Sequence, residues 1–387
     1  MKLNFKDKKY KEIAMQSKGY SEIKSNHKMS DAFMLLLKGV KQQDLSNLCL
    51  KMQNGFKEKG KNLSVDECYN LIQGDFENTS LKTEGEVRRY IQGSFGEYLL
   101  DFAYECITEV ELDENGNLKQ KHLGNNVISN GTINTSSWLT HSLYEAKAAQ
   151  KLAEILVLDT EKAGILALLH DYGRKFAHDF SHVTRGFEAL VDEGWVEEAR
   201  ATITHSFINA GRCTNCDPAE EGFYIDESGN PKWKEGTEKD DVTEVLEHLQ
   251  YDDYDMILNI ADLMATDRGI TSPYDRVQDV ATRKTPDVRN RGYFLSEFTN
   301  KLIYVINSIE NYSKEDRVNP LMDPKELETK FKEVSQDFFE MFSKERTISI
   351  KDLVSYAIAD VRLSEMGKKD SKTKITEENE IGEITDK

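Results

Sequence analysis

The amino-acid sequence predicts an all-α protein, and three observations support this prediction. Pro occurs only 6 times in 387 residues, so few positions interrupt a helix. Charged residues make up 31% of the chain and hydrophobic residues 38%, a balance typical of packed amphipathic helices. Apolar residues also recur at helical spacing along most of the chain, often after a capping Ser, Thr or Asp. The length predicts two or three structural units.

The first part of the chain predicts helices but contains no motif with a chemical meaning. Residues 1–27 are rich in Lys and weakly patterned, which indicates a weakly ordered basic arm. Residues 28–130 predict an N-terminal helical region that ends in a short hairpin. The hairpin follows from the alternating pattern of residues 110–118, centred on Asn115-Gly116, a pair typical of a type I′ turn. A lid, an oligomerisation element and a partner-binding module all fit this region.

Residues 134–311 form a second region with its own helical pattern. A polar stretch with Gly and Pro near residues 211–240 predicts a loop insertion. Residues 312–366 predict further C-terminal helices, and the almost wholly polar residues 367–387 predict a disordered tail. The helices expected across these regions cover residues 136–156, 159–170, 180–193, 196–206, 242–249, 254–266 and 325–342.

The composition excludes several classes of partner. The net charge is −18, from 51 basic and 69 acidic residues. A field of this sign repels nucleic-acid backbones and anionic membranes, so we expect neither a nucleic-acid polymer nor a membrane as a partner. No stretch approaches the ~18 consecutive apolar residues of a membrane span. A homo-oligomer is compatible with this composition.

Cysteine usage and the amino terminus favour a cytoplasmic protein with reduced thiols. The 5 cysteines are an odd and sparse set for a disulfide framework. The first residues lack the apolar run of a secretory signal. Cys213 and Cys216 form a single Cys-x-x-Cys pair, which supplies only part of a tetrahedral zinc site. The two cysteines are therefore either ordinary loop thiols or part of a zinc site.

The most informative feature of the chain is His170-Asp171, which follows the apolar run of residues 164–169. An imidazole and a carboxylate at the end of a buried helix cost free energy unless something pairs with them. Divalent metal ions are the usual partners, because they prefer imidazole and carboxylate ligands. Further candidates lie in or beside other predicted helices, which suits a bundle whose ligands project inward. They are His141, His182, His205 and Asp262.

In this order the residues resemble the HD superfamily of metal-dependent phosphohydrolases, over roughly residues 134–311. The segment His170-Asp-Tyr-Gly-Arg174 matches the family's His-Asp-x-Gly-Lys/Arg core. His182-Val-Thr-Arg-Gly186 resembles the His-x-x-x-Gly element of members with two metals. His141 matches the first histidine of the family, and His205 matches a later helix histidine. Asp262 matches the aspartate of the family's terminal Ala-Asp.

The resemblance implies an HD-type helical bundle that holds two divalent metal ions, such as Mn, Fe or Mg. His178 competes with His182 as a ligand, but it lacks the x-x-x-Gly context that follows His182. The implied ligands of one ion are His141, His170, Asp171 and Asp262, and those of the second are Asp171, His182 and His205.

The implied activity is hydrolysis of a phosphoester or phosphoanhydride by a metal-activated water. The expected partner is a small phosphorylated metabolite, with a nucleotide as the leading candidate. Asp171 would serve both ions, and Arg174 and Lys175, about one turn further, would contact phosphate oxygens. Surface ion pairs are the alternative role for both cations. The chain departs from the HD-GYP cyclic-dinucleotide phosphodiesterases, because Ser206 rather than a second His follows His205.

Two other functions fit the same residues. A branch of the superfamily that includes inositol oxygenase uses a similar ligand set for a mixed-valence di-iron centre, and iron accepts the same donors. A non-catalytic sensor that binds a nucleotide through this region is the other alternative. Arg174 and Lys175 favour a hydrolase over an oxygenase, because phosphate requires cations. The complete ligand set argues against a sensor, which has no need for paired metal ions.

Overall fold

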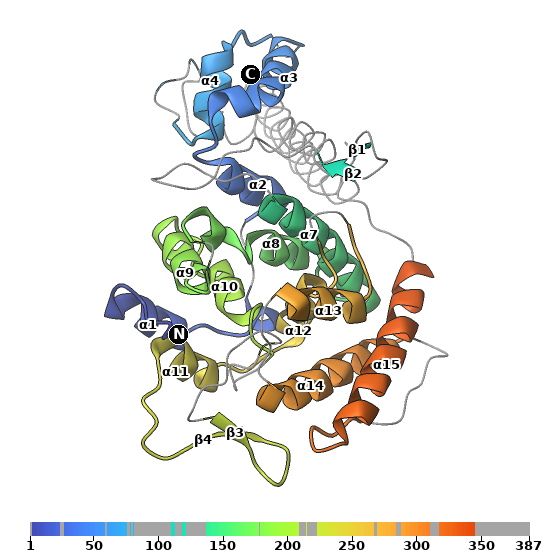
Figure 1. Ribbon diagram of the computed structural model, residues 1–387. Helices are drawn as coiled ribbons and strands as arrows, with labels where there is room; N and C mark the ends of the chain where they lie inside the picture. The colour runs from blue at the N-terminus through green and yellow to red at the C-terminus, as the bar shows by residue number, and fades with distance from the viewer. Residues whose placement is uncertain are drawn as a thin grey trace, which may run out of the picture. The chain divides into compact units, whose positions relative to one another are not determined.

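The computed structural model describes residues 2–23, 27–58, 60–75, 78, 80, 110–112, 118–120, 137–177, 179–208, 214, 223–266, 269–283, 288–309 and 317–344. These residues are mostly helical, as the sequence predicts (Figure 1). The chain divides into two compact units. The larger unit consists of Met1–His27 with Glu105–Ile348, and the smaller unit of Lys28–Tyr104 with Ser349–Lys387.

The smaller unit is helical in its described part. The apolar faces of α3 and α4 are buried where the two helices pack together, and they include the free thiols of Cys49 and Cys68. Helix α4 begins with a capping box, in which the Ser64 and Glu67 side chains each accept a hydrogen bond from the other's backbone amide. The elements are α2 (Met29–Leu37), η2 (Gln42–Leu45), α3 (Ser46–Glu58) and α4 (Val65–Ile72).

The larger unit is built around two helices that pack along each other, α7 (Ser137–Ile155) and α8 (Thr160–Leu169). Asp159 caps α8 by accepting a hydrogen bond from the Lys162 amide, as the sequence predicts. Helix α12 packs against both α7 and α8 (Figure 1). The remaining helices are η1 (Tyr20–Glu22), η4 (Tyr172–Lys175), α9 (His182–Asp192), η5 (Glu198–Arg200), α10 (Ala201–Thr204), α11 (Asp241–His248), α12 (Asp253–Asp262), α13 (Pro273–Arg283), α14 (Val288–Asn307) and α15 (Pro324–Lys344).

Two short hairpins accompany these helices. Strands β1 (Val110–Leu112) and β2 (Leu118–Gln120) pair antiparallel at the predicted hairpin. Strands β3 (Phe223–Ile225) and β4 (Pro231–Trp233) pair in the same way within the predicted loop insertion. The turn between β1 and β2 and the predicted tail, residues 367–387, lie outside the described residues.

Residues 2–23 differ from the expected weakly ordered arm, because they form hydrogen bonds with distant residues of the larger unit, to which they belong. Helix α1 (Lys8–Met15) packs against α9 and α11. The backbone amides that precede it donate to carboxylates 182 to 237 residues further along the chain, a separation that local patterning does not reveal. The pairs are Leu3 N with Asp240 Oδ2 (2.7 Å), Phe5 N with Asp241 Oδ2 (3.1 Å) and Lys6 N with Glu188 Oε1 (2.6 Å).

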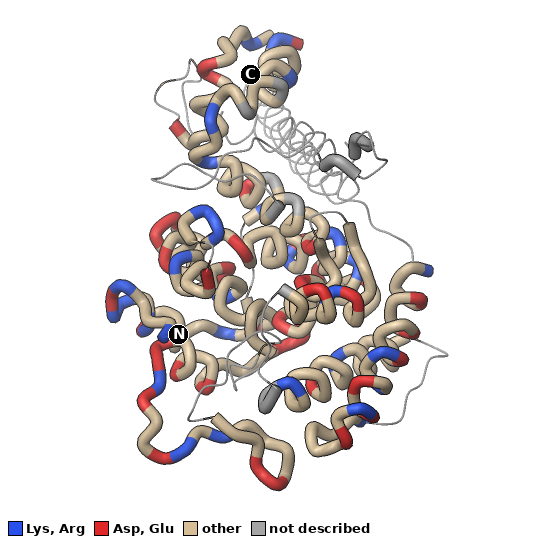
Figure 2. Tube along the Cα trace, in the orientation of Figure 1, with Lys and Arg blue, Asp and Glu red and all other residues tan. Residues whose placement is uncertain are grey.

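The basic character of this N-terminal segment has a local use. Figure 2 shows the basic residues of α1 beside the acidic residues of α11. Lys11 Nζ lies 2.8 Å from Asp241 Oδ1 and 2.9 Å from Glu244 Oε2. The lysines of the segment thus bind acidic side chains of the same unit rather than forming a free tail.

None of the described helices is long and apolar enough to cross a membrane.

Candidate metal centre

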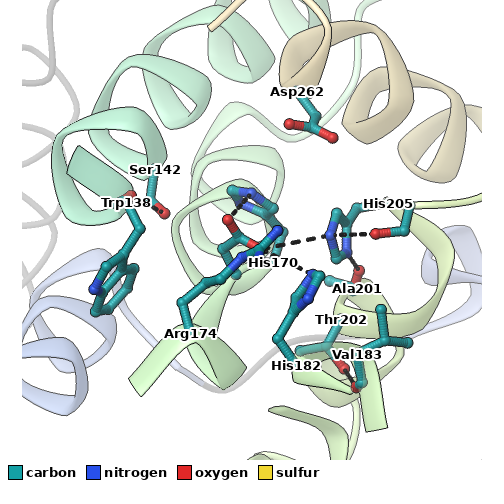
Figure 3. A network of polar contacts seen from close by, with 12 residues as sticks. Trp138, Ser142, His170, Arg174, His182, Val183, Ala201, Thr202, His205 and Asp262 are labelled. Atoms are coloured by element: carbon teal, nitrogen blue, oxygen red, sulfur yellow. Dashed lines mark hydrogen bonds and ion pairs between the residues drawn. The ribbon is translucent and has the colours of Figure 1, made fainter. Parts of the chain in front are cut away.

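The six predicted metal ligands come together in the larger unit, where Figure 3 shows His170, His182, His205 and Asp262 directed towards a shared space. They come from five places in the fold. His141 lies on α7, His170 and Asp171 follow α8, His182 opens α9, His205 follows α10, and Asp262 ends α12. Five of the six are buried, and the Asp262 side chain is 24% exposed. The convergence therefore depends on the packing of five helices.

The end of α8 brings two of these ligands into the interior. All residues from Ala163 to Leu169 are buried, so this helix runs through the core. His170 keeps a helical backbone, whereas Asp171 leaves it with φ −97° and ψ 17° and starts η4. This change of direction brings the two side chains to the same cluster, with His170 Nε2 3.6 Å from Asp171 Oδ2.

Two glycines allow η4 to lie directly on the first turn of α9. A Cβ added to Gly173 would be 1.8 Å from the His182 carbonyl oxygen and 2.7 Å from the Gly186 amide nitrogen. A Cβ on Gly186 would be 2.9 Å from the Gly173 nitrogen. No larger residue fits at such separations. The glycines two residues after Asp171 and four after His182 therefore set the distance between these ligands.

Three imidazoles are oriented by backbone carbonyls. The Nδ1 atoms of His170, His182 and His205 lie 2.6, 2.7 and 3.0 Å from the carbonyl oxygens of Ala167, Asp179 and Ala201. A carbonyl only accepts hydrogen bonds, so Nδ1 carries a proton in each ring, and in the neutral ring the lone pair is on Nε2. This tautomer is the one that binds metals through Nε2. The Nε2 atoms of His170 and His182 are buried without a hydrogen-bond partner. The Nε2 atom of His205 lies 2.8 Å from the Ser206 hydroxyl.

Asp171 is the most connected of the carboxylates. Its Oδ1 atom lies 3.2 Å from His182 Nε2, 3.7 Å from His205 Nε2 and 3.1 Å from Arg174 Nε. Its Oδ2 atom lies 3.6 Å from His170 Nε2. Although burial alone would raise it, the pKa of Asp171 is held well below its usual value by Arg174 and His170. The carboxylate is therefore ionised at neutral pH.

Glu145 is a member of this cluster that the sequence interpretation missed. It lies one turn after His141 on α7, is fully buried, and places Oε2 2.9 Å from His170 Nε2 and 3.5 Å from His141 Nε2. Both are ion-pair contacts, and neither oxygen has a further hydrogen-bond partner among the described residues. Its position four residues after His141 was an available signal, because such residues share a helix face.

The donor atoms fall into two groups, each with its atoms within 4.8 Å of one another. The predicted grouping differs, because it placed Asp171 with His141 and Asp262 and shared it between two ions. In the structure His170 is the residue common to both groups, while His182 contacts the second group through Asp171. The first group is His141, Glu145, His170 and Asp262, and the second is His170, Asp171 and His205.

Burial and mutual charge shift the titration of these groups. Burial raises the pKa of Glu145 to about 8, against the attraction of His170. Burial, together with the charge of His170, lowers the pKa of His205 to about 3, so its imidazole is neutral. Burial likewise lowers the pKa of His182. Burial lowers the pKa of His170, but the carboxylates of Glu145 and Asp171 raise it well above its usual value, so this imidazole carries a proton that a bound metal ion would displace. Neutral His182 and His205 beside ionised Asp171 are in the protonation states that metal ligation requires.

The two predicted phosphate contacts have different surroundings. Arg174 touches the cluster through Asp171, and its side chain is 25% exposed (Figure 3). Lys175 is buried, and its Nζ atom lies 4.2 Å from the centroid of the Tyr172 ring. A cation over an aromatic face is a stabilising contact in its own right. Arg174 is therefore the cation that the structure places at the cluster.

Helix α12 holds the far side of the site through Asn259, three residues before Asp262. The Asn259 amide donates to the carbonyl oxygens of Thr204, His205 and Phe207, at 2.9, 2.9 and 3.2 Å. Its own oxygen accepts from Lys301 Nζ at 2.8 Å. The buried Asn259 thus fixes the chain around His205 relative to Asp262.

Comparison with protein families, curated proteins and solved structures gives no match to this chain. The interpretation of the site therefore depends on its residues and geometry. Three residues considered from the sequence, His178, Cys213 and Cys216, lie outside the described residues.

Proposed function

We propose that the protein is a metal-dependent phosphohydrolase with an HD-type site, acting on a small phosphorylated metabolite, with nucleotides as the first class to test. The observation that carries the proposal is the buried cluster of imidazoles and carboxylates, in which the Nε2 atoms of His170 and His182 and both oxygens of Glu145 lack hydrogen-bond partners among the described residues. Buried polar atoms are normally paired, so a group of them left without partners calls for a ligand.

The chemistry of the donors fits divalent metal ions. Imidazole nitrogen and carboxylate oxygen are the ligands that Mn, Fe and Zn accept, and an ionised Asp171 supplies negative charge. The orienting carbonyls behind His170, His182 and His205 are the outer partners typical of metal-binding histidines. The residues that would hold the ions include His141, His170, Asp171, His182, His205 and Asp262. Bound divalent ions would lower the pKa of a water molecule and neutralise charge on a phosphoryl group.

Arg174 supports a phosphorylated substrate. Asp171 holds the guanidinium through Nε at 3.1 Å, so the cation stands beside the cluster at its partly exposed side. A guanidinium in this place attracts an anionic substrate and can bind phosphoryl oxygens. The net charge of −18 disfavours a polymeric nucleic acid, which supports a small phosphorylated molecule as the substrate.

The proposal is tested by replacing the carboxylate that touches most of the cluster. We expect Asp171→Ala to reduce bound metal and to lower hydrolysis of a nucleotide panel by at least about 100-fold, because loss of even an outer partner costs 10- to 100-fold. Metal is measured by elemental analysis and hydrolysis by phosphate release. Glu193→Gln, which removes a charge from the exposed end of α9, serves as the control. Full metal content and full activity in Asp171→Ala would contradict the proposal.

The oxygenase alternative predicts a different metal behaviour. An oxygenase would retain iron after anaerobic purification and change its absorption spectrum on exposure to oxygen. The proposed hydrolase would release phosphate with Mn or Mg and show no such spectral change. The two measurements on one preparation therefore separate the two functions.

A further inference from the structure

We propose that Glu145 is a metal ligand, and that it makes the two halves of the centre unequal in affinity. The inference rests on the metal centre of the proposed function and assigns a ligand that the sequence motifs do not include. Glu145 belongs to the first donor group, with His141, His170 and Asp262.

The polar contacts of Glu145 with other described side chains are with two candidate metal ligands, His170 at 2.9 Å and His141 at 3.5 Å. The side chain is fully buried on α7, among the small residues Ala146, Ala148 and Ala149 of the same helix. Neither carboxylate oxygen accepts a hydrogen bond from any described residue. A buried carboxylate without hydrogen bonds is costly, and a bound cation removes that cost.

The contact with His170 assigns that imidazole to the Glu145 half of the centre. A neutral imidazole with its proton on Nδ1 has a single lone pair, on Nε2, so it ligates one ion only. His170 Nε2 is 2.9 Å from Glu145 Oε2 and 3.6 Å from Asp171 Oδ2. The shorter contact places His170 with Glu145, so Asp171 remains with His182 and His205.

The resulting halves differ in charge. When a divalent cation displaces the Glu145 proton, the first half has two carboxylates, Glu145 and Asp262, with the imidazoles of His141 and His170, and these charges neutralise the ion. The second half has one carboxylate, Asp171, which already faces the Arg174 guanidinium at 3.1 Å. Affinity for a divalent cation rises with the number of charged ligands. The first half therefore binds its ion more tightly and is filled first.

The test is a metal titration of the full chain with Mn²⁺ and Co²⁺, in the absence of substrate. We expect two binding phases for the unaltered protein. Glu145→Gln keeps the size of the side chain and removes its charge, and we expect it to weaken the tighter phase by at least about 10-fold. We also expect the visible spectrum of the first Co²⁺ bound to change, because an anionic carboxylate ligand is replaced by an uncharged and weaker amide. Glu154→Gln, an exposed carboxylate on the same helix, is the matched control.

Each outcome decides the inference. Unchanged affinity and an unchanged Co²⁺ spectrum in Glu145→Gln would overturn it, because a side chain that only accepts or donates hydrogen bonds tolerates Gln. If Glu145→Gln does not fold, Glu145→Asp is used instead, because it keeps the charge on a shorter side chain. An altered Co²⁺ spectrum in Glu145→Asp supports the inference, and an unaltered spectrum overturns it. The proposed phosphohydrolase activity is tested separately. If metal binding depends on Glu145 but no nucleotide releases phosphate, Glu145 is still a metal ligand and the proposed activity is wrong.

Discussion

Two buried ionic clusters lie in the larger unit, and they differ in how completely their polar atoms are paired. One is the ion pair of Arg200 and Asp255, and the other is the candidate metal centre. Both place charges where water does not reach. The first is complete within the protein, whereas the second leaves atoms without partners. The comparison separates a site that stabilises the fold from a site that requires a ligand.

The Arg200 cluster satisfies its charges with protein groups alone. The guanidinium contacts both oxygens of Asp255, through Nε at 3.2 Å and through Nη2. It also donates to the backbone carbonyls of Lys18 at 3.0 Å and Gln250 at 2.7 Å. The Arg200 side chain lies 5.3 Å from the centroid of the Tyr20 ring. These contacts join the N-terminal segment to α12 and explain why a charged pair is tolerated at this depth.

The metal centre has the opposite character. His170 and His182 keep Nε2 atoms without hydrogen bonds, and both oxygens of Glu145 are in the same condition. Backbone carbonyls hold the Nδ1 atoms of both imidazoles, so each Nε2 atom faces a carboxylate, Glu145 at 2.9 Å and Asp171 at 3.2 Å. Completion by a cation is the simplest way to pair these atoms.

Helix α12 connects the two clusters through one polar stripe. Asp255 faces Arg200, Asn259 binds the carbonyls around His205, and Asp262 contacts His141 at 3.0 Å. Residues four and three positions apart fall on the same helix face. A single helix therefore carries both a stabilising ion pair and a candidate ligand.

The largest effect on stability is expected from breaking the complete cluster. Arg200→Met leaves the Asp255 carboxylate buried without its partner, and we expect the free energy of unfolding to fall by about 3–5 kcal/mol. Urea unfolding measures the loss. It should be the same with and without a metal chelator, because this cluster involves no metal.

The control for this prediction is an ion pair that is less buried. Lys239→Met breaks the pair with Glu247, whose side chains are 30% and 34% exposed, and should cost at most about 1 kcal/mol. An equal loss in the free energy of unfolding in both variants would contradict the prediction that the buried ion pair matters more for stability than the partly exposed one.

A smaller effect is expected from removing metal, and it concerns only the incomplete cluster. An ion that binds only the folded chain, at a free concentration of about 100 times its Kd, raises the free energy of unfolding by about 2.7 kcal/mol. We therefore expect the Tm to rise with added Mn²⁺ and to fall with a chelator, as calorimetry would record. Asp171→Ala should weaken this dependence, whereas Arg200→Met should leave it intact. An identical Tm in chelator and in excess metal would contradict the prediction.

The smallest effect on stability is expected where the stripe of α12 supports the site. Asn259→Leu leaves the buried carbonyls of Thr204, His205 and Phe207 without a donor, at a cost of about 1–3 kcal/mol. Because His205 then loses its support, we also expect weaker metal binding, measured by titration with Mn²⁺.

Asn300→Leu is the matched control for Asn259→Leu. Its amide binds the carbonyl of Val318 at 3.0 Å, and its oxygen accepts from the Val318 amide at 2.8 Å. This variant should lose stability without losing metal affinity. Equal metal affinity in both variants would show that Asn259 supports the fold and not the site.

Much of the helical fold could be predicted because its signals are local. The capping box at Ser64 and Glu67 and the cap at Asp159 depend on residues three positions apart, and the structure confirms them. The helix expected over residues 196–206 is instead divided into η5 and α10, and the helix expected to reach residue 266 ends at Asp262. Helix ends are decided by competing contacts that spacing does not describe.

The candidate site was predicted in part. The order of His141, His170-Asp171, His182, His205 and Asp262 was visible as ligand chemistry, and the folded chain brings these residues together. Glu145 was missed, since an acidic residue in a helix is ordinarily solvent-exposed. Only the packing of α7 on α8 shows that its carboxylate faces His170.

The sequence by itself determined the helical class, the caps and the set of candidate ligands, because periodicity and residue chemistry are properties of neighbouring positions. The tertiary structure alone decided which charges are paired. It tied Leu3 to Asp240 and Arg200 to Asp255, and it left the Glu145 oxygens and the Nε2 atoms of His170 and His182 without hydrogen-bond partners among the described residues. Pairing between distant residues depends on how buried surfaces pack, which no local pattern specifies.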